Sequence, residues 1–544
     1  MELIPQIPHL QSLLLLIFAA SLYLVTGAIY HLYFSPIARF PGPKVAALTF
    51  WYEFYYDVIC RGRYTWKIEE LHRKYGPVIR INPQELHVVD PAFYDTVYAG
   101  PSRRTAKWEY SARMFGTSLA AVGTTSHELH RLRRSALNSF FSKRSISKLE
   151  PTIQHVVDHA CTLVERTAST GCAVNLRNFF AAFSADVVGE VAFGSTYGFL
   201  DRPNFDPGWQ RLMMDLSRGT HLMKQFPWAY AILNSIPESL VSLLHPLTKR
   251  LFDIRHDIRL KIEQTKASLR HTLDNPGPEH SDDEVDHPTV LHSLLASPTL
   301  PAAELLTPRL EDESFTLLGA GTITTAHTLT TILYYVLSNP AIKSQLESEL
   351  AELSSAAPNK PLRLDLKHLE QTQYLSAVIS EGLRLSFGVS HRLPRISPET
   401  ALQYQGTIDG KDYKYIIPPG VPVSMTQMFI HLDPSIYTSP HAFEPERWLT
   451  DLRDDEDAKV GLRRMKHYLV PFSKGTRMCA GMHLAYAELY LMLGALFAPG
   501  GVGRRMELFE TGDGDVKCAH DFFNPSPRLD SKGVRIVLAR EKAN

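Results

Sequence analysis

The chain has 544 residues, and its 57 Lys and Arg side chains balance its 57 Asp and Glu side chains, so the formal net charge is zero. A chain without a basic surplus lacks the electrostatic attraction of a nucleic-acid binder, and we expect no nucleic-acid partner. Hydrophobic residues make up 44% of the chain, which excludes a disordered protein and is enough for a large core. Five cysteines are a sparse and odd set, and we expect free thiols in a reducing compartment.

The N-terminal segment is apolar and uncharged from residue 3 to residue 38. The run from Leu10 to Phe34 exceeds the roughly 20 residues that a helix needs to cross a bilayer. A cleaved signal peptide, the competing interpretation, has an apolar region of only about 7–15 residues behind a basic start. We therefore predict one uncleaved transmembrane helix within residues 1–38, followed by a stiff proline-containing hinge over residues 35–44. The nearest basic residues follow the span, which places the body on the cytoplasmic side.

The remaining residues, 39–544, are predicted to form one domain that is mainly α with a minor β portion. Apolar positions at three- and four-residue spacing predict helices over residues 64–75, 126–138, 146–169, 176–193, 246–273, 309–338, 341–353, 374–386 and 483–497. Short β-branched and aromatic runs predict strands over residues 78–82, 86–89, 401–417 and 535–538. The Pro- and Asp-rich stretch 274–288 has the composition of an exposed loop within this domain.

The sharpest local pattern surrounds Cys479, which lies just before a predicted helix. The helix N-terminus and its N–H groups favour a thiolate at such a position, and Arg477 adds a positive neighbour. Gly475 and Gly481 let the backbone approach a flat ligand closely, while Phe472 covers the sulfur side. These features predict a metal thiolate. A lone cysteine at a turn has an alternative interpretation as a buried and inert thiol.

The spacing F-x-x-G-x-R-x-C-x-G over residues 472–481 resembles the haem-binding loop of the cytochrome P450 family. Two further motifs follow the order of that family, since Glu381 and Arg384 are similar to its E-x-x-R helix and residues 443–448 to its P-E-R-[FW] segment. The resemblance implies the cytochrome P450 fold, haem b as cofactor, and Cys479 as the axial ligand of its iron. Residues 39–544 would then be the haem-thiolate catalytic domain.

The resemblance also implies how the neighbouring regions are used. Glu381, Arg384 and Arg447 would form a buried cluster beneath the haem. The anchor and hinge are similar to those of the microsomal branch, which implies a single-pass protein of the endoplasmic reticulum membrane with its catalytic domain in the cytoplasm.

Several basic residues match positions that bind the haem propionates in this family. His130 and Arg134 occupy the first and last positions of W-x-x-x-R, with His in place of Trp, and Arg395 follows the E-x-x-R helix. With Arg477 they would provide three arginines for two carboxylates. For His130 a solvated basic helix face is the alternative. Nearby residues expected on the thiolate-side surface, where an acidic reductase could dock, are Arg131, Arg133, Lys466 and Lys474.

The predicted helix 309–338 contains Gly and Thr residues in its middle, where they weaken a helix. This run resembles the family's oxygen-binding motif A-G-x-[DE]-T, in which a local bulge admits O₂ and water. Ala320, Gly321 and Thr324 match, and the resemblance implies a catalytic role for them and for the adjacent Thr325. Ile323 occupies the position of the acid.

An isoleucine cannot relay a proton, which leaves three interpretations open. The two threonines and ordered water suffice, hydroxyl groups of the substrate supply protons, or the enzyme does not use O₂ in the usual way.

Three functions follow from these patterns. The first is a haem-thiolate monooxygenase. It would receive electrons from NADPH-cytochrome P450 reductase, with cytochrome b5 as a further donor, because no G-x-G-x-x-G dinucleotide-binding motif follows a strand in this sequence. The second is a reductase-independent isomerase or dehydratase of the same fold, which the missing acid permits. The third is a non-catalytic haem or lipid carrier, for which an oxygen-binding groove is unnecessary.

The substrate is expected to be bulky and apolar. By resemblance, residues that line the pocket are mostly apolar; they include Trp108, Met114, Phe115, Met213, Met214, Phe226, Trp228, Phe315, Leu318, Val389 and Phe523. Residues 62–66, 75–83 and 528–535 are similar to those of filamentous-fungal family members in secondary metabolism, trichodiene oxygenase among them. This resemblance implies a terpenoid first and a polyketide second.

Overall fold

The computed structural model describes residues 7–235, 246–274, 289–355, 365–449 and 456–539. The predicted loop at 274–288 lies outside these residues, apart from Asp274 itself. No disulfide links the cysteines, and all five thiols are free as expected.

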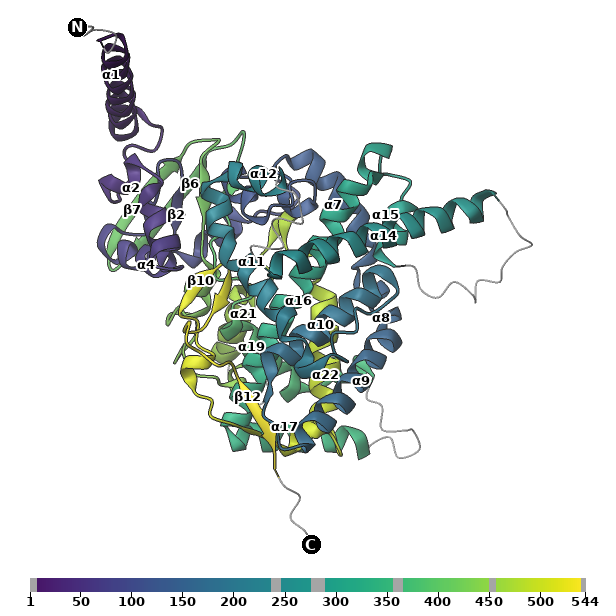
Figure 1. The fold of residues 1–544 in the computed structure, drawn as a ribbon. Coiled ribbons are helices and arrows are strands. Elements are labelled where there is room, and N and C mark those ends of the chain that lie inside the picture. The colour runs from purple at the N-terminus through teal and green to yellow at the C-terminus, as the bar shows by residue number, and fades with distance from the viewer. Residues whose placement is uncertain (1–6, 236–245, 275–288, 356–364, 450–455, 540–544) are drawn as a thin grey trace, which may run out of the picture.

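The N-terminal apolar segment is a helix, as predicted. Helix α1 (Ile7–Ile29) continues into a π-helical turn, η1 (Tyr30–Phe34). The 24 residues Gln11–Phe34 are long and apolar enough to cross a membrane, and none of this span is buried in the protein. Figure 1 shows α1 standing apart from the body, next to the corner that contains α2 and the hairpin β6–β7.

The lower end of this helix is fastened to the body through Arg80. The buried Arg80 guanidinium donates to the carbonyl oxygens of His31 in η1 (2.7 Å), Ala47 (3.3 Å) and Pro83 (2.7 Å). Burial lowers the pKa of Arg80 to about 10, so the group keeps its charge at neutral pH. A protonated guanidinium holds backbone carbonyls more firmly than a neutral donor does, so the anchor and the body share a hydrogen-bonded joint.

The body is mostly helical. Its helices are α2 (Lys44–Leu48), α3 (Trp51–Phe54), η2 (Tyr55–Ile59), α4 (Tyr64–Tyr75), α5 (Tyr94–Val97), α6 (Glu109–Ala112), α7 (His127–Phe140), α8 (Lys143–Lys148), α9 (Glu150–Ser169), α10 (Leu176–Phe193), α11 (Pro207–Gln225), α12 (Pro227–Ser235), α14 (Pro246–Asp274), α15 (Val290–Leu295), α16 (Thr307–Ser338), α17 (Pro340–Ser355), α18 (Leu366–Gln371), α19 (Gln373–Ser386), α20 (Gln427–His431), α21 (Glu456–Tyr468) and α22 (Met482–Phe497).

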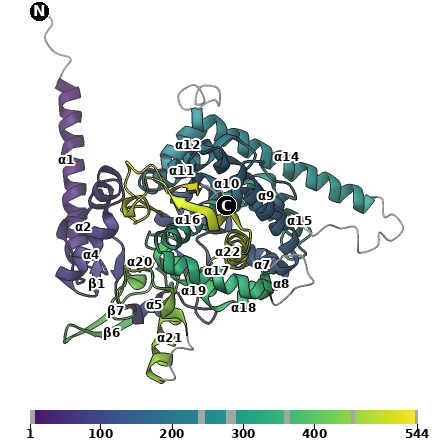
Figure 2. The same cartoon turned by 90° about the horizontal axis from the view of Figure 1, so that it is seen from below.

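The main core forms where α9, α10, α16 and α22 meet, near the centre of the body in both Figure 1 and Figure 2. Helix α10 is apolar on nearly all sides and almost entirely buried, as expected for a helix with no face toward water. At its contact with α16, a Cβ added at Gly321 would lie 2.5 Å from Cγ2 of Val188. Gly321 therefore permits the close approach of these two helices.

Within the described residues, the strands form four small sheets. The largest has the order β1-β2-β8-β5-β3, in which only β2 and β8 run parallel. The strands are β1 (Val78–Arg80), β2 (Leu86–Val88), β3 (Ala106–Lys107), β4 (Val174–Asn175), β5 (Arg395–Ile396), β6 (Leu402–Ile408), β7 (Lys411–Ile417), β8 (Pro422–Ser424), β9 (Met506–Leu508), β10 (His520–Phe522), β11 (Asn524–Ser526) and β12 (Arg535–Leu538).

Two predicted elements are divided in the structure. The helix predicted over 146–169 is α8 followed by α9, which begins at Glu150 with Pro151 in its first turn, where a proline is tolerated. The strand-like run 401–417 is the hairpin β6–β7, which turns at Asp409 and Gly410. Both turn residues have positive φ, and an Asp-Gly pair is suited to such a turn.

Candidate functional site

The loop around Cys479 has a tightly fixed backbone. The Cys479 N–H donates to the carbonyl oxygen of Phe472 (2.9 Å), and the Phe472 ring packs against Tyr486. Gly475 has a φ of +78°, and a Cβ there would collide with the carbonyl oxygen of Ala99. Only glycine fits this position without strain.

The Cys479 side chain is accessible even though protein surrounds it. Burial raises the pKa of the thiol, while the Gly481 N–H and the charge of Arg134 lower it. No protein atom lies within 4 Å of the position that a Cβ on Gly481 would take. The loop therefore presents a sulfur atom and an open glycine to whatever binds beside it, as a flat ligand requires.

Two of the predicted propionate-binding arginines are found without an acidic partner. Arg477 donates to the carbonyl oxygens of Thr124 (2.7 Å) and Thr125 (2.9 Å), and its Nε makes no hydrogen bond. Arg395 is buried and donates only to backbone carbonyls, among them that of Pro394 (3.1 Å). Burial, reinforced by Arg395, lowers the pKa of Arg477 to about 9.

Sequence reasoning missed a further cation in this group. Lys107 on β3 pairs with Arg395 on β5 in the sheet, and its Nζ donates to the carbonyl oxygen of Val122 (2.7 Å). Burial, with smaller contributions from Arg395 and Arg477, holds its pKa well below the ordinary value. No local signal marks Lys107, because a strand register joins residues almost 290 positions apart.

His130 lies among these cations and is buried, so the alternative of a solvated helix face is wrong. Burial, Arg477 and Arg134 together lower the pKa of His130 to about 3, so the imidazole is neutral at physiological pH. A neutral imidazole still donates one hydrogen bond.

The four cations Lys107, Arg134, Arg395 and Arg477 form no ion pair with any carboxylate in the part of the chain that the structure describes. A group of desolvated cations without acids is unfavourable unless a ligand brings the negative charge. The two propionates of haem have the charge that this arrangement lacks, so the residues present fit the cofactor.

A second predicted cluster, at Glu381, is confirmed. Its carboxylate accepts hydrogen bonds from Arg384 (2.6 and 2.9 Å), Arg447 (3.1 Å) and Trp448 Nε1 (2.9 Å). Arg384 also donates to three backbone carbonyls, including that of His431 (2.9 Å). This network is buried and joins α19 to the 3-10 turn η8 (Pro445–Trp448), so it fixes the core on which the Cys479 loop rests.

The helix with the oxygen-binding pattern, α16, is α-helical from Thr307 to Ser338 without a break. Instead of a bulge, the Thr324 hydroxyl donates to the Ala320 carbonyl oxygen (2.9 Å) and remains exposed. Thr325 is buried. The helix is therefore regular where a bulge was expected. Threonine can make such a side-chain hydrogen bond to the carbonyl oxygen four residues earlier without breaking the helix.

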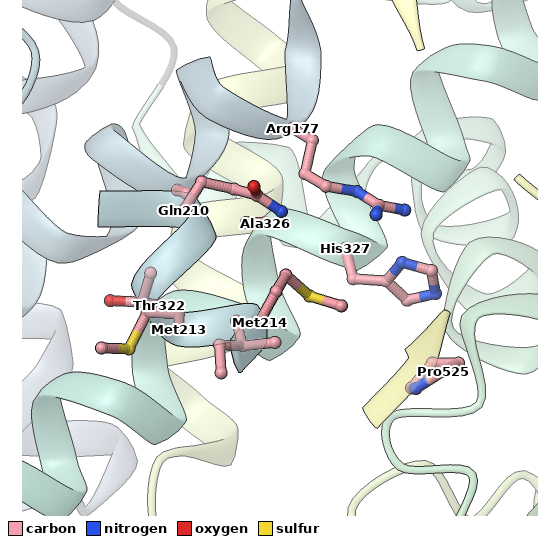
Figure 3. A pocket seen from close by; sticks show the side chains of 10 residues that line it. Arg177, Gln210, Met213, Met214, Thr322, Ala326, His327 and Pro525 are labelled. Carbon is pink, nitrogen blue, oxygen red and sulfur yellow. The ribbon is translucent and has the colours of Figure 1, made fainter. Parts of the chain in front are cut away.

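Ile323 lines a narrow recess between α10, α11 and α16. Figure 3 shows polar side chains in its wall, those of Arg177, Gln210, Thr322 and His327. We call this feature the Arg177 recess.

Comparison with known proteins decides the family. The cytochrome P450 family model matches residues 41–498. The chain belongs to the cytochrome P450 family. Like its relatives, it is a P450 monooxygenase, and the family uses a haem-thiolate iron, hydrophobic substrates and redox partners.

Several fungal P450s are similar over almost their full length. A tryptophan 6-hydroxylase of Fusarium equiseti is 40% identical over 536 residues, which cover 98% of each chain. An N-acetyltryptophan 6-hydroxylase of Emericella nidulans is 40% identical over 544 residues, covering 99% of each. A cytochrome P450 monooxygenase of Cochliobolus heterostrophus is 38% identical over 540 residues, covering 98% of each.

The predicted substrate-pocket residues of this P450 divide into two groups. Phe115 and Phe523 meet edge to face with ring centroids 4.8 Å apart, and Met213 and Met214 line the Arg177 recess. Phe226 instead packs against Trp51, Phe54 and Trp228 near the surface, where Trp228 is 60% exposed. Periodicity on α11 and α12 could not distinguish these surfaces.

The predicted reductase-docking residues also divide. Arg133 is buried and paired with Glu304 (2.7 and 3.0 Å), so its placement on the surface is wrong. Arg131 is exposed, and Lys474 pairs with Asp95 (2.8 Å) at the surface. Adjacent residues on one helix face in different directions, which explains why Arg133 and Arg134 have different partners.

Proposed function

We propose that this P450 inserts one oxygen atom from O₂ into a bulky, largely apolar secondary metabolite, with Cys479 as the axial ligand of haem b. The observation that carries the proposal is the group of unpaired cations beside an open thiol loop. When bound, a haem iron with a thiolate ligand supplies the binding and cleavage of O₂.

The chain's own residues orient that cofactor. Arg134, Arg395 and Arg477 pair with the two propionates, Lys107 adds a fourth cation, and neutral His130 donates a hydrogen bond. Phe472 shields the sulfur, while Gly475 and Gly481 keep the loop close to the ring. The Gly481 N–H holds negative charge on the sulfur of Cys479.

Proton delivery falls to α16. The Thr324 hydroxyl, which now donates to Ala320, can turn to donate its proton on the open side and take another from water. Thr325 supports this segment from its buried side, and Gly321 keeps α16 against α10. We infer that water and hydroxyl groups replace the missing acid at Ile323.

The reductase-independent isomerase was the alternative from sequence. The relatives' names, hydroxylases and monooxygenases, favour the monooxygenase. The electron donor we propose is NADPH-cytochrome P450 reductase, with cytochrome b5 as a further donor. We place the catalytic domain, residues 39–544, in the cytoplasm below an anchor within residues 1–38 in the endoplasmic reticulum membrane, supported by the exposed apolar helix α1.

Three substrate classes have support. Sequence resemblance and the Met- and Phe-rich walls favour a terpenoid, with polyketides next. The two relatives named for hydroxylation of tryptophan and N-acetyltryptophan support an indole-bearing amino acid derivative as a third candidate. A panel of terpenoids, polyketides and tryptophan derivatives, scored for oxygenated product by mass spectrometry, distinguishes them.

A carbon monoxide difference spectrum of the membrane-expressed protein tests the proposal. We expect a thiolate-type Soret band after reduction by dithionite and also by NADPH with co-expressed reductase, and its loss in Cys479→Ser. A band with dithionite alone, in the presence of the substrate panel, would count against reductase-driven oxygenation. A band retained in Cys479→Ser would disprove the ligand assignment.

A further inference from the structure

The hairpin β10–β11 turns at one residue whose side chain is poorly suited to a turn. Phe522 pairs with Asn524 in the strand register, so Phe523 alone joins the two strands. Its φ is +69°, a left-handed conformation that glycine adopts freely and that other residues adopt rarely. Such conformations persist where the surrounding structure enforces them, and they cluster at functional sites. The contacts of Phe523 therefore indicate what its ring is for.

The side chain of Asp521 holds this turn. Its Oδ1 accepts from the N–H of Phe523 (3.0 Å) and from the hydroxyl of Ser390 (2.8 Å). Its Oδ2 accepts from the hydroxyl of Thr65 (2.6 Å) and from Nδ1 of His391 (2.9 Å). Asp521 and its three side-chain donors are buried. One carboxylate thus fastens the turn to α4 and to the segment that follows α19.

Asp521 also belongs to a group with the composition of a metal site. Together with His221 and His391 it offers ligand atoms that lie within 4.8 Å of one another. The two oxygens of the carboxylate, however, already accept two hydrogen bonds each from the protein, which occupies all of their acceptor positions. Burial raises the pKa of Asp521, but His391 and the hydrogen bonds outweigh burial and hold it below the ordinary value. The group is a carboxylate fixed by protein donors.

The carbonyl groups of the turn are fixed as well. The carbonyl oxygen of Phe523 accepts from the N–H of Ser390 (3.0 Å), and that of Phe522 accepts from the hydroxyl of Ser217 (2.7 Å) on α11. Within the run 521–527, Phe523 is half-buried and the other residues are buried. The backbone of the turn is therefore held on both sides, and part of the Phe523 ring stays open to a ligand.

The Phe523 ring is connected to the Cys479 loop by a short series of contacts. It meets the half-buried Phe115 ring edge to face, with ring centroids 4.8 Å apart. Nζ of Lys107 lies 4.7 Å from the centroid of the Phe115 ring. The backbone N–H of Lys107 and the guanidinium of Arg477 donate to the same backbone carbonyl oxygen, at 3.1 and 2.9 Å. The two rings therefore lie beside the cations that we propose to bind the haem propionates.

The geometry points to Asp521 as a positioning residue that holds the Phe523 ring in the wall of the substrate pocket. Its hydrogen bonds keep an unfavourable backbone conformation in place and so fix the direction of the ring. The ring, together with Phe115, then selects ligands that present an aromatic face. This inference rests on the proposed function, because the wall faces a substrate only if the haem is bound at Cys479.

The experiment uses the full-length, haem-loaded protein and two imidazole ligands of different size. An imidazole nitrogen binds haem iron directly, and clotrimazole carries three aryl rings on the same group, which reach the walls of the pocket. Spectral titration, with competition for the tighter ligand, gives both dissociation constants without turnover. We call the ratio of the imidazole constant to the clotrimazole constant the aryl preference. Phe523→Ala should lower it about fivefold, as expected for the loss of one aromatic pair.

A double-mutant cycle assigns this effect to Asp521. Asp521→Ala should lower the aryl preference by a similar factor, and the double variant with Phe523→Ala should lower it no further, because the carboxylate acts through the ring. Asp521→Asn keeps one acceptor oxygen and should give a smaller loss; it replaces Asp521→Ala in the cycle if that variant yields no haem-loaded protein.

The matched controls are Asp186→Ala and Asp186→Asn. Asp186 is also a buried carboxylate that accepts backbone N–H groups, among them those of Tyr197 and Leu200 (3.0 Å each), and these partners lie outside the site. Both control variants should keep the aryl preference of the parent, even where they lower the free energy of unfolding.

Several outcomes would overturn the inference. These are a parent that binds clotrimazole no more tightly than imidazole, an unchanged aryl preference in Phe523→Ala or in both Asp521 variants, additive losses in the double variant, and an equal loss in Asp186→Ala. The carbon monoxide spectrum is recorded on the same samples. A normal thiolate band together with any of these outcomes rejects the inference alone, and a missing band in the parent rejects the proposed function.

Discussion

Ile323 occupies the position where the oxygen-binding motif described above has an acid, and the structure shows what surrounds it. Its side chain packs against the apolar core and lines the Arg177 recess, whose wall also contains the half-buried Arg177 and His327. A carboxylate placed there would have Arg177 within the same recess, so it would be ionised and could relay protons.

We expect Ile323→Glu to leave the product unchanged and to raise the fraction of NADPH electrons recovered in it, because proton delivery improves. Ile323→Gln, which has the same shape without the charge, should resemble the parent. The measurement is product formed per NADPH consumed. A change from a rearranged to a hydroxylated product would contradict the monooxygenase assignment.

Lys107 provides a second prediction at this scale. Lys107→Met removes one basic side chain from the group that we propose to bind the propionates. Bound propionates would favour the charged form of this lysine, so the purified variant should bind haem about tenfold less tightly. Haem titration of the apoprotein measures the affinity, and Lys148→Met, at an exposed position on α8, is the control. Equal haem affinity in both variants would show that Lys107 does not contribute to haem binding.

Individual residues of the site differ in how well the sequence predicts their surroundings. Glu381 lies in a short motif, where all the information is local, and its buried cluster is confirmed. Cys479 and Arg477 also lie in a short motif, and their roles toward haem stay predictions. Lys107 and Arg177 carry no local signal, because their surroundings come from segments almost 290 and 150 positions away in the chain. Arg133 was misplaced because the rotation of α7 depends on its packing and not on its charge pattern.

At the scale of elements, the contact of α10 with α16 depends on one glycine. Gly321→Ala would bring a methyl group against Val188, and overpacking of this kind typically costs about 1–3 kcal/mol. We expect a lower free energy of unfolding in urea, with part of the loss recovered in the double variant with Val188→Ala. Without such recovery, the packing role of Gly321 would be wrong.

Most helices were predictable because periodicity and proline positions are local, and α4, α10 and α22 match within a residue. The groove in α16 was not predictable. Its resemblance implied a bulge, whereas threonine back-bonding keeps the helix regular. The strand order of the five-stranded sheet could not be predicted from the sequence either, since β3 and β5 pair although they lie far apart in the chain.

At the scale of the whole molecule, buried neutral histidines connect stability to pH. The His72 ring lies 2.8 Å from the Gly76 carbonyl oxygen and 2.7 Å from His87, which in turn contacts Thr426 (2.9 Å). His431 Nε2 accepts from the Val470 N–H (2.9 Å). Burial lowers the pKa of His72 to about 4 and that of His431 to about 3, and holds that of His87 well below its usual value.

A folded-state pKa below the unfolded value means that the unfolded chain takes up the proton first, so stability falls as the pH drops below about 6.5. At pH 5.5 each such histidine should cost about 1.4 kcal/mol relative to pH 7.5. Urea unfolding at both pH values, at constant ionic strength, checks this. A stability that stays flat across this range would show that these rings become charged in the native state.

The joint at Arg80 has a consequence for how the enzyme meets its redox partner. Because the guanidinium holds η1, helix α2 and the loop at Pro83 at once, a bilayer around α1 would fix the tilt of the catalytic domain and its height above the lipid. Two proteins mounted in the same membrane in this way need to search only two translations and one rotation each. The rate of electron transfer would then be limited by lateral diffusion and by rotation of each protein about the membrane normal. A catalytic domain that tumbled freely on a loose tether would have to search more orientations.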